Sequence, residues 1–416
     1  IEASVFLPDT TKGKALNRWL SESHDFRVMV VGTESLSQGQ MSKIAERFLL
    51  AHPKVMMVID ESHMIATHRA ARSVACVELG RKAICRAVLS GTPISTGPMN
   101  LFMQFEFLDP DIIGIGDYYA FRNRYAVMGG YHDDKGRPLQ IVGYQNIDEL
   151  TATVAPYVFE VRKSDVLDLP PKVYKKVYVQ LTSQQRELYR KIRKEGEYTI
   201  NEKSAVAKNV LELALRLHQV AGGHITTYEE QPQLNGKVKK IPTVHHLVKP
   251  EDNPKIQELL DIADDGRAMI VWCAYRSEVA DVVAALRARF PNDLIREIHG
   301  GINEDDRNTF KNEFQSGACR ILVSNTATGG TGLTLTACEI MIYYNNTDKM
   351  VDREQSEDRA HRDGLKHSVL IIDLIAENTV DEVIIQSIRD KVDLSEFIRR
   401  RIAAAGANVG AILGEN

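Results

Sequence analysis

The stretch V55-M-M-V-I-D-E-S-H63 sets the fold class of this sequence. Residues 55–59 are all apolar, and a short apolar run without alternation is typical of a strand buried on both faces of a parallel sheet. Two adjacent carboxylates, Asp60 and Glu61, follow the run directly. The first can hold Mg²⁺ and the second can activate a water molecule. Taken alone, however, the pattern more often describes a strand followed by a solvated acidic turn.

A nucleotide-hydrolysing site of this kind also needs a loop that binds phosphate. No G-x-x-x-x-G-K-[ST] sequence occurs in residues 1–416. Asp60 and Glu61 therefore represent half of such a site, and the phosphate-binding half has to come from elsewhere.

The composition is that of a globular protein with two or three domains. Hydrophobic residues make up 44% of the chain and charged residues 26%, and no apolar run is long enough to span a membrane. The five cysteines are widely spaced, which favours a reducing compartment over a disulfide framework. No secretory leader opens the sequence. We expect a cytoplasmic protein of a prokaryote or a virus-infected cell, or a nuclear one in a eukaryote. The net charge of −4 neither requires nor excludes nucleic acid.

Strand-like and helix-like segments alternate in two separate blocks, which predicts an α/β fold with two parallel sheets. The first block has strands at 3–7, 26–31 and 55–59, a further strand that ends at 88–89, and helices at 14–20 and 43–50. The second block has strands at 269–273, 294–298, 320–324 and 340–344, and helices at 277–290 and 304–314. Between the blocks we expect an irregular excursion at 101–157, a break at 169–171, helices within 182–222 and a loop at 228–240.

Three further stretches can carry chemistry. In L89-S-G-T-P93, Ser90 and Thr92 follow a strand and can sense phosphate, although a plain turn is the simpler interpretation. In V323-S-N-T-A-T-G-G-T-G-L333, backbone N–H groups and hydroxyls can approach phosphates closely. In the arginine segment, Q355-S-E-D-R-A-H-R362, a helix would place Arg359 and Arg362 on one face. A sequence of this composition more often forms a charged, solvent-exposed helix without a catalytic role.

The order of these stretches matches a known family. The chain resembles the Swi/Snf-related group of superfamily 2 helicase-like ATPases, the DNA translocases. D60-E-S-H63, S90-G-T-P-I94, S324-N-T-A-T-G-G-T-G-L333 and the arginine segment resemble motifs II, III, V and VI of that family. Weaker similarities occur at T33-E-S-L36, I270-V-W-C-A-Y275, H299-G-G301 and V161-R-K-S-D-V-L-D-L-P-P-K172.

The resemblance implies two RecA-like domains that close on ATP, with a helical insertion or linker between them. The implied divisions are a first domain at 1–166, a linker region at 167–252, a second domain at 253–395 and a tail at 396–416. In the family a phosphate-loop unit precedes the strand matched here by residues 3–7. The first domain is therefore expected to be N-terminally truncated, with an upstream segment or a second polypeptide supplying the loop.

The resemblance also implies roles for single residues. Asp60 would bind Mg²⁺ and Glu61 would activate water, while Gln355, Arg359 and Arg362 would reach the nucleotide from the second domain, with Arg362 as the arginine finger. Ser90 and Thr92 would couple hydrolysis to movement. Ser35, Asn325 and Thr326 would contact nucleic-acid phosphates. Gly330 and Gly332 would provide flexibility near the nucleotide.

Three functions follow as hypotheses. The first is an ATP-driven translocase that moves on double-stranded DNA without sequence preference. The second is a helicase that separates strands of DNA or RNA. The third is a nucleic-acid-binding module that has lost hydrolysis or is completed in trans. Several departures, such as Ser95-Thr96 after the S-G-T-P-I94 stretch, favour a compact bacterial or viral member of the family over a chromatin remodeller.

Overall fold

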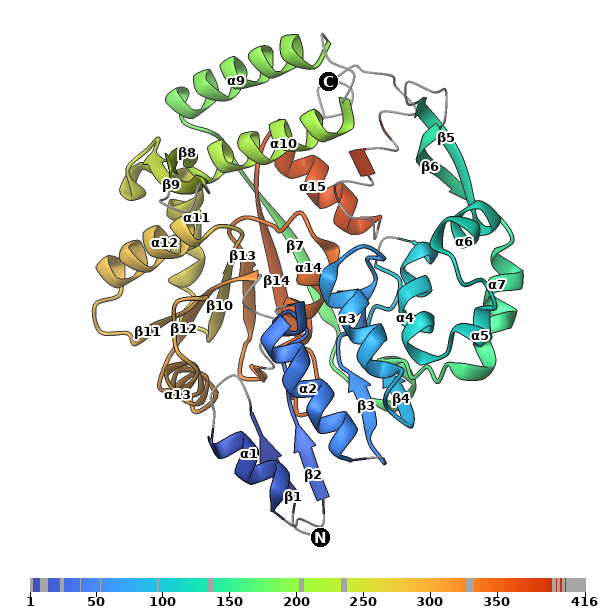
Figure 1. The fold of residues 1–416 in the computed structure, drawn as a ribbon. Coiled ribbons are helices and arrows are strands. Elements are labelled where there is room, and N and C mark those ends of the chain that lie inside the picture. Colours follow the sequence, from blue (N-terminus) through green and yellow to red (C-terminus); the bar gives the residue numbers. More distant parts are fainter. Residues whose placement is uncertain are drawn as a thin grey trace. The chain divides into compact units, whose positions relative to one another are not determined.

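The computed structural model divides the chain into two compact units, residues 1–160 and residues 161–416. Figure 1 shows the fold. No helix among the residues described is both long and apolar enough to cross a membrane. The structure describes residues 3–7, 14–22, 26–37, 39–52, 54–95, 97–132, 138–201, 206–232, 238–326 and 333–390, and also residues 394, 397, 398 and 401.

Unit 1 begins with two short parallel strand pairs and their helices. Strands β1 (Ala3–Phe6) and β2 (Phe26–Met29) form one pair, and β3 (Met56–Ile59) and β4 (Cys85–Val88) form the other. The helices of this part are α1 (Lys14–Ser21), α2 (Gly39–Ala51) and α3 (Ala71–Gly80). The predicted strand–helix alternation is confirmed here, with strand ends shifted by one or two residues.

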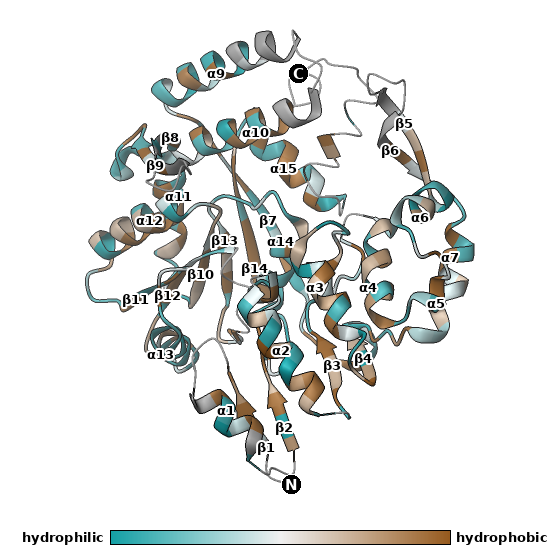
Figure 2. Cartoon of the chain, in the orientation of Figure 1, coloured by the Kyte–Doolittle hydropathy of each residue, from teal (hydrophilic) through white to brown (hydrophobic). Residues whose placement is uncertain are grey.

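Strand β3 is not buried on both faces, so that prediction was wrong. Ile59 is 3% exposed and packs into the core of unit 1, but Met56 is 57% exposed and Val58 is 47% exposed. Side chains on a strand point alternately to opposite faces, so one face of β3 is covered and the other is open. On the other pair, Val5 and Phe26 are also more than half exposed, and Figure 2 shows the apolar colouring along these strands.

Most of the described residues between 101 and 157 lie in helices or strands, contrary to the predicted irregular excursion. They form helices α4 (Leu101–Leu108), α5 (Pro110–Ile113), α6 (Tyr118–Tyr125) and α7 (Ile147–Val154) and the antiparallel hairpin β5 (Ala126–His132) and β6 (Pro138–Tyr144). Aspartates start two of these helices, since Asp109 accepts a hydrogen bond from the N–H of Asp111 and Asp117 from that of Ala120. Five aromatic side chains of this stretch are buried in the core of unit 1: Phe102, Phe105, Phe107, Phe121 and Tyr125.

Unit 2 is built on a six-stranded parallel sheet in the order β11-β12-β10-β13-β14-β7. The strands are β7 (Lys172–Val179), β10 (Met269–Cys273), β11 (Ile295–Ile298), β12 (Ile321–Asn325), β13 (Ile340–Tyr343) and β14 (Val369–Ala376). The helices that accompany them are α11 (Pro254–Ala263), α12 (Arg276–Arg289), α13 (Glu304–Gln315), α14 (Met350–Asp358) and α15 (Val380–Arg389).

Both faces of this sheet are covered. Residues of the central strand β10 alternate between two hydrophobic clusters: Val271 packs with α11 and α12, and Trp272 packs with Phe314 of α13. Every residue of β10 is buried, which explains the unbroken apolar run in its sequence. The α/β fold class predicted from the sequence is confirmed.

The inserted region carries a helix pair and a hairpin. Helices α9 (Ser183–Asn201) and α10 (Val206–Gly222) share a hydrophobic cluster with α15. The polar stretch 228–240 was predicted to be a loop, but strands β8 (His224–Pro232) and β9 (Val238–His246) pair antiparallel through it. The β-branched residues of these two strands, Ile225, Thr226, Thr227, Val238, Ile241, Thr243 and Val244, favour strand structure even beside lysine and glutamate.

Candidate functional site

The acidic pair lies at the carboxyl end of β3. Asp60 and Glu61 follow Ile59 directly, and Leu89 follows the neighbouring strand β4 at the same edge. Two backbone hydrogen bonds join these ends: the N–H of Leu89 donates to the carbonyl of Ile59 at 2.8 Å, and the N–H of Ser62 donates to the carbonyl of Leu89 at 2.9 Å. The carboxyl ends of parallel strands are where α/β proteins bind ligands, so this edge suits a reactive pair.

Glu61 has a left-handed backbone, with φ 50° and ψ 53°. A non-glycine residue costs about 1–3 kcal/mol in this conformation, and such residues cluster at functional sites. Its N–H donates to Oδ1 of Asp60 at 2.9 Å, and its Oε2 lies 3.2 Å from Nδ1 of His63. The turn therefore directs the Glu61 side chain away from the path that an extended strand would take, and His63 contacts it.

A buried glutamine joins this turn to the S-G-T-P stretch. Gln104, on α4, is 2% exposed. Its Oε1 accepts a hydrogen bond from the hydroxyl of Ser62 at 2.6 Å, and its Nε2 donates to the carbonyls of Pro93 at 2.7 Å and Asn100 at 2.9 Å. Gln104 thus fastens the residue after the acidic pair to the loop after β4.

The two predicted coupling residues lie within that loop. The hydroxyl oxygen of Ser90 accepts a hydrogen bond from the N–H of Thr92 at 3.1 Å, and both residues are partly exposed. The structure therefore brings Ser90 and Thr92 to the same edge as Asp60 and Glu61.

The predicted phosphate-contacting residues divide between the two units. Ser35 begins a short 3₁₀ turn in unit 1 and donates its N–H to the carbonyl of Gly32 at 3.0 Å. Asn325 ends β12 in unit 2, and Thr326 after it is 4% exposed. Gly330 and Gly332 fall outside the residues that the structure describes.

The arginine segment does not form one helix, so its predicted helical face was wrong. Helix α14 ends at Asp358, which leaves Gln355 within it, Arg359 at its C-cap and Arg362 in the turn that follows. The carbonyl of Arg359 accepts a hydrogen bond from the N–H of Leu335 at 2.8 Å. This hydrogen bond connects the arginine segment to the residues that directly follow the Gly/Thr stretch. The side chains of Gln355, Arg359 and Arg362 are all partly exposed.

A buried arginine anchors α14 to the sheet. Arg353 is 3% exposed, with Nη1 2.6 Å from Oδ1 of Asp373 on β14 and Nε 2.7 Å from Oε1 of Glu357. Its guanidinium also lies over the ring of Tyr343, 3.4 Å from the centroid. Charged groups at this depth persist only when they are paired, so Arg353 fixes the position of the helix that carries Gln355.

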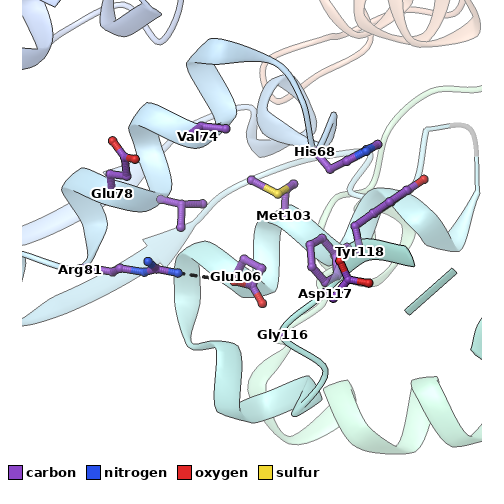
Figure 3. A pocket seen from close by; sticks show the side chains of 11 residues that line it. His68, Val74, Glu78, Arg81, Met103, Glu106, Gly116, Asp117 and Tyr118 are labelled. Atoms are coloured by element: carbon purple, nitrogen blue, oxygen red, sulfur yellow. Dashed lines mark ion pairs between the residues drawn. The ribbon is translucent and has the colours of Figure 1, made fainter. Parts of the chain in front are cut away.

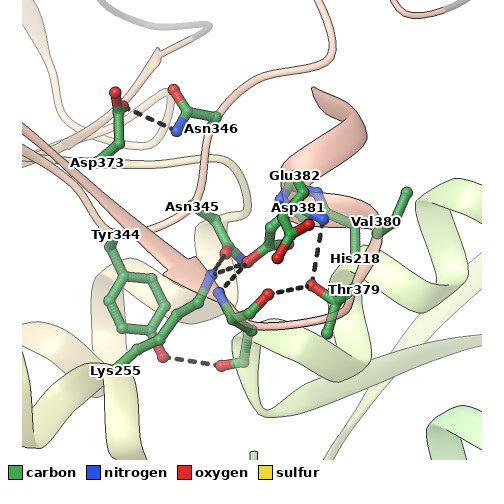
Figure 4. A network of polar contacts seen from close by, with 12 residues as sticks. His218, Lys255, Tyr344, Asn345, Asn346, Asp373, Thr379, Val380, Asp381 and Glu382 are labelled. Atoms are coloured by element: carbon green, nitrogen blue, oxygen red, sulfur yellow. Dashed lines mark hydrogen bonds and ion pairs between the residues drawn. The ribbon is translucent and has the colours of Figure 1, made fainter. Parts of the chain in front are cut away.

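A second polar network in unit 2 joins helices α11, α12 and α15 to the residues that follow β13, and Figure 4 shows part of it. Lys255 is 1% exposed, and its Nζ donates to Oδ2 of Asp381 at 2.6 Å and to the side chain of Asn345. Asn345 in turn donates to Glu278 at 2.5 Å. Burial raises the pKa of Glu278 to about 7, and burial lowers the pKa of His218 to about 4. Both groups thus favour the neutral form more than they would in water.

The pocket in Figure 3 lies within unit 1, has a volume of about 240 Å³ and contains none of the predicted site residues. The His68 ring stacks on Tyr118 with centroids 3.6 Å apart, and Glu106 faces Arg81 at 3.8 Å. Burial raises the pKa of Glu106, and Arg81 opposes that shift. The pocket therefore mixes aromatic, acidic and basic groups and does not define one ligand class.

Two family models match this chain. The SNF2-related domain matches residues 4–223, and the helicase conserved C-terminal domain matches residues 253–364. The first match alone covers more than half of the 416 residues. The chain belongs to the SNF2-related family. The recognition of this family from the motifs is thereby confirmed for this SNF2-related chain.

Several curated proteins are similar to this SNF2-related chain. An uncharacterized ATP-dependent helicase of Mycoplasma genitalium is 27% identical over 348 residues, which is 81% of this chain and 30% of that protein. The human SWI/SNF-related matrix-associated actin-dependent regulator of chromatin subfamily A member 1 is 26% identical over 362 residues, 82% of this chain and 31% of that protein. The chain spans 20–35% of the length of the curated relatives that it matches.

Among solved structures, the SWI2/SNF2 ATPase core of Sulfolobus solfataricus in complex with dsDNA is similar. It is 20% identical, with a TM-score of 0.44, and the match covers 100% of this chain and 81% of that chain.

Sequence reasoning missed the residues that hold the site together. Gln104 interrupts the apolar run L101-F-M-Q-F105, and a polar residue inside an apolar helix was the available signal. Arg353 and Glu357 lie four residues apart on α14, yet their partner Asp373 is remote in sequence, so the pattern alone did not reveal the buried set.

Proposed function

We propose that this chain is the motor core of a translocase that moves on double-stranded DNA. The observation that carries the proposal is the left-handed Glu61 beside Asp60 at the carboxyl end of β3, in a chain that also carries the arginine segment, which runs from α14 toward the start of β14 in a second parallel sheet. A strained acidic residue at a strand end is expected where it must meet a substrate, and a solvated acidic turn has no use for that strain.

Within this proposal Glu61 is the general base. Its carboxylate accepts a proton from the attacking water, and His63 at 3.2 Å helps to orient it. Arg359 and Arg362 stabilise the charge that develops on the transferred phosphoryl group, a role worth roughly 10³–10⁵ in rate in related enzymes. Arg362 is our choice for the finger because it lies beyond the helix end, in a turn.

Mg²⁺ is the metal we propose for this reaction. Among the residues described, no three His, Cys, Asp or Glu side chains gather as a metal site. Mg²⁺ does not need such a cage, because it usually takes one or two carboxylates together with waters and phosphate oxygens. Asp60 is exposed at a strand end and fits that role. When bound, the ion would neutralise phosphate charge.

The phosphate-binding groups are proposed to come from polypeptide outside residues 1–416, either in the same protein or in a second chain. Two observations support this. No G-x-x-x-x-G-K-[ST] sequence occurs, and the strand pairs β1–β2 and β3–β4 form separate two-stranded sheets with apolar side chains exposed, Val5 at 57% and Met56 at 57%. Exposed apolar strand faces are rare in isolated domains, so a further strand would suit this part of unit 1.

DNA contact is proposed to be directed at phosphates, through Ser35, Asn325 and Thr326. Binding of this kind carries little sequence preference and weakens steeply with salt, by about 0.9 log units of affinity per log unit of salt for each phosphate contact. Equal affinity for duplexes of unrelated sequence, with this salt dependence, is the expected result.

The test compares Glu61→Gln with a matched control, Glu46→Gln, in the full-length protein. The two carboxylates are similarly exposed, 46% and 39%, and lie in the same unit. We expect DNA-stimulated ATPase activity to fall at least 100-fold in the first variant with duplex binding retained, and to stay near wild type in the second. Full activity of Glu61→Gln would refute the role of the base.

A strand-separating helicase is the alternative within the same enzyme class. Displacement of a third strand from a triplex, without separation of a plain duplex, is expected of the proposed translocase. A wild-type protein that binds DNA but hydrolyses no ATP would instead support a nucleic-acid-binding module.

A further inference from the structure

The chain enters unit 2 through residues 161–171, here called the linker segment, which lead directly into β7. Lys163 in the linker segment and Lys172, the first residue of β7, pair with the end of helix α14. Nζ of Lys163 lies 2.6 Å from Oδ1 of Asp358, and Nζ of Lys172 lies 2.8 Å from Oε2 of Glu357 and 3.6 Å from Oδ1 of Asp358. Glu357 and Asp358 belong to the arginine segment, and neither received a role from the sequence.

The linker segment also contacts the arginine segment beyond the helix. Nε2 of His361 lies 2.9 Å from the carbonyl oxygen of Pro170, and Nζ of Lys163 lies 3.5 Å from the carbonyl oxygen of His361. Contacts to residues 357 and 358 on one side and to residue 361 on the other therefore bracket Arg359. All of these contacts lie within unit 2.

Glu357 is held from two directions. Lys172 and the hydroxyl of Tyr174 on β7 donate to Oε2 at 2.8 Å each, and Arg353 donates to Oε1 at 2.7 Å. Burial would raise the pKa of Glu357, but Arg353 and Lys172 outweigh it and lower the pKa. The carboxylate is therefore charged at neutral pH and joins the start of β7 to α14.

Stability alone does not account for the Asp358 contacts. Lys163 and Asp358 are 46% and 44% exposed, and exposed ion pairs add little to folding. Asp358 is also the last residue of α14, where a negative charge opposes the helix dipole. An acid that destabilises its own helix is better explained by its contacts to Lys163 and Lys172.

We propose that the linker segment positions the arginine segment for ATP hydrolysis, with Lys163 and Lys172 acting through Asp358 and Glu357. This inference rests on the proposed function of Arg359 and Arg362. The last residue of unit 1, Glu160, precedes Lys163 by three positions, so a change in the path of the chain between the units reaches the arginines through these contacts. The lysines are positioning residues and touch no substrate.

The test uses Asp358→Asn and Lys163→Met in the full-length protein, with Lys163→Arg as the conservative variant. The matched control is Asp264→Asn, because Asp264 is also 44% exposed, pairs with Arg289 at 2.9 Å and caps a helix of the same unit. We expect the first two variants to lower kcat about three- to fivefold, the most that one exposed ion pair can bias. KM for ATP and the thermal midpoint should stay unchanged. Lys163→Arg and Asp264→Asn should match wild type.

Glu357→Gln extends the series, since it weakens the buried contact to Lys172, and it should lower kcat at least tenfold. Unchanged kcat in both Asp358→Asn and Lys163→Met would overturn the proposal. Equal loss in Asp264→Asn, or a fall in the thermal midpoint that parallels the loss of kcat, would overturn it as well, because the effect would then be general.

Hydrogen exchange separates this inference from the proposed function. If the wild-type protein shows no DNA-stimulated ATPase activity, the proposed function fails. Hydrogen exchange of residues 350–362 then decides whether the linker contacts order the arginine segment. About fivefold faster exchange in Asp358→Asn, absent in Asp264→Asn, supports the linker contacts as the element that orders this segment. Unchanged exchange overturns them.

Discussion

Replacing Gln104 with methionine removes the link between the acidic turn and the S-G-T-P stretch while keeping the size of the side chain. In the structure Gln104 is 2% exposed and makes three hydrogen bonds, one from Ser62 and two to the carbonyls of Pro93 and Asn100. Methionine makes none of them, so the hydroxyl of Ser62 and the carbonyl of Pro93 lose these partners.

The magnitude follows from those groups. The hydroxyl of Ser62 is buried, and a buried polar group left without a partner costs about 1–3 kcal/mol. The bonds to Pro93 and Asn100 are part-buried and together add about 1 kcal/mol, so the expected loss for Gln104→Met is about 3 kcal/mol. Ser62→Ala removes only the donor and leaves one amide oxygen, so about 1–2 kcal/mol is expected. Because the two residues share one bond, the double variant should be less destabilised than the sum, by about 1 kcal/mol.

The assay uses the two tryptophans of the chain, Trp19 in unit 1 and Trp272 in unit 2. In a Trp272→Phe background, Trp19 fluorescence during urea unfolding reports unit 1 alone. Trp19 is 7% exposed and its indole N–H donates to the hydroxyl of Ser4 at 2.8 Å, so its emission should change on unfolding.

Gln185→Met is the matched control, because Gln185 is a fully buried glutamine of unit 2 that donates to the carbonyl of Val220 at 3.0 Å. It should leave the Trp19 midpoint unchanged. A loss below about 0.5 kcal/mol for Gln104→Met, or strict additivity with Ser62→Ala, would refute the reasoning, since the three hydrogen bonds would then contribute nothing net.

Three further predictions concern single residues. Glu61→Gly should raise the free energy of unfolding of unit 1 by about 1 kcal/mol in the Trp19 assay, because glycine adopts the left-handed backbone without strain. The same variant should lose ATPase activity. A destabilised variant would contradict the inference that the Glu61 backbone is strained. Arg353→Met should cost about 3–5 kcal/mol in unit 2, followed by Trp272 fluorescence, because Asp373 is left charged and buried; a cost under 1 kcal/mol would count against this. Burial raises the pKa of Glu278 to about 7, so the folded state keeps a proton that the unfolded state releases above pH 4.5, and this group lowers stability as pH rises to 7. The stability of Glu278→Gln relative to wild type should therefore rise by about 3 kcal/mol between pH 4.5 and 8, and a flat difference would exclude the shift.

Local patterns predicted most of the secondary structure because each depends on neighbouring residues. The helix predicted at 304–314 is present as α13, and Asn303 before it accepts a hydrogen bond from the N–H of Asp306 at 2.8 Å, a local cap of the kind that marks helix starts in a sequence. The strand predicted at 269–273 is likewise present as β10, and the structure buries all five of its residues.

The failures share a different cause. The run of β3 is as apolar as that of β10, yet Met56 and Val58 are exposed, because burial depends on which elements pack against a strand and the run itself does not record them. The positions of Arg359 and Arg362 depend on where α14 ends, and helix ends are the least certain feature of a periodic pattern.

The candidate site was predicted residue by residue where the family motifs match, and the polar groups that support it were not. Gln104 bonds to Ser62, 42 residues away, and Lys172 bonds to Glu357, 185 residues away. Such pairs form only when the tertiary structure brings remote segments together, so no window of sequence contains them.

The edge position of β7 has a consequence for synthesis on the ribosome. β7 is the first strand of unit 2 to emerge, yet it pairs with β14, the last one, from Lys172 with Val369 to Val179 with Ala376. The backbone of β7 therefore has no neighbouring strand to pair with until almost the whole unit has been translated. Pairings this remote form slowly, so we expect nascent chains that end before residue 369 to need chaperone protection along this strand.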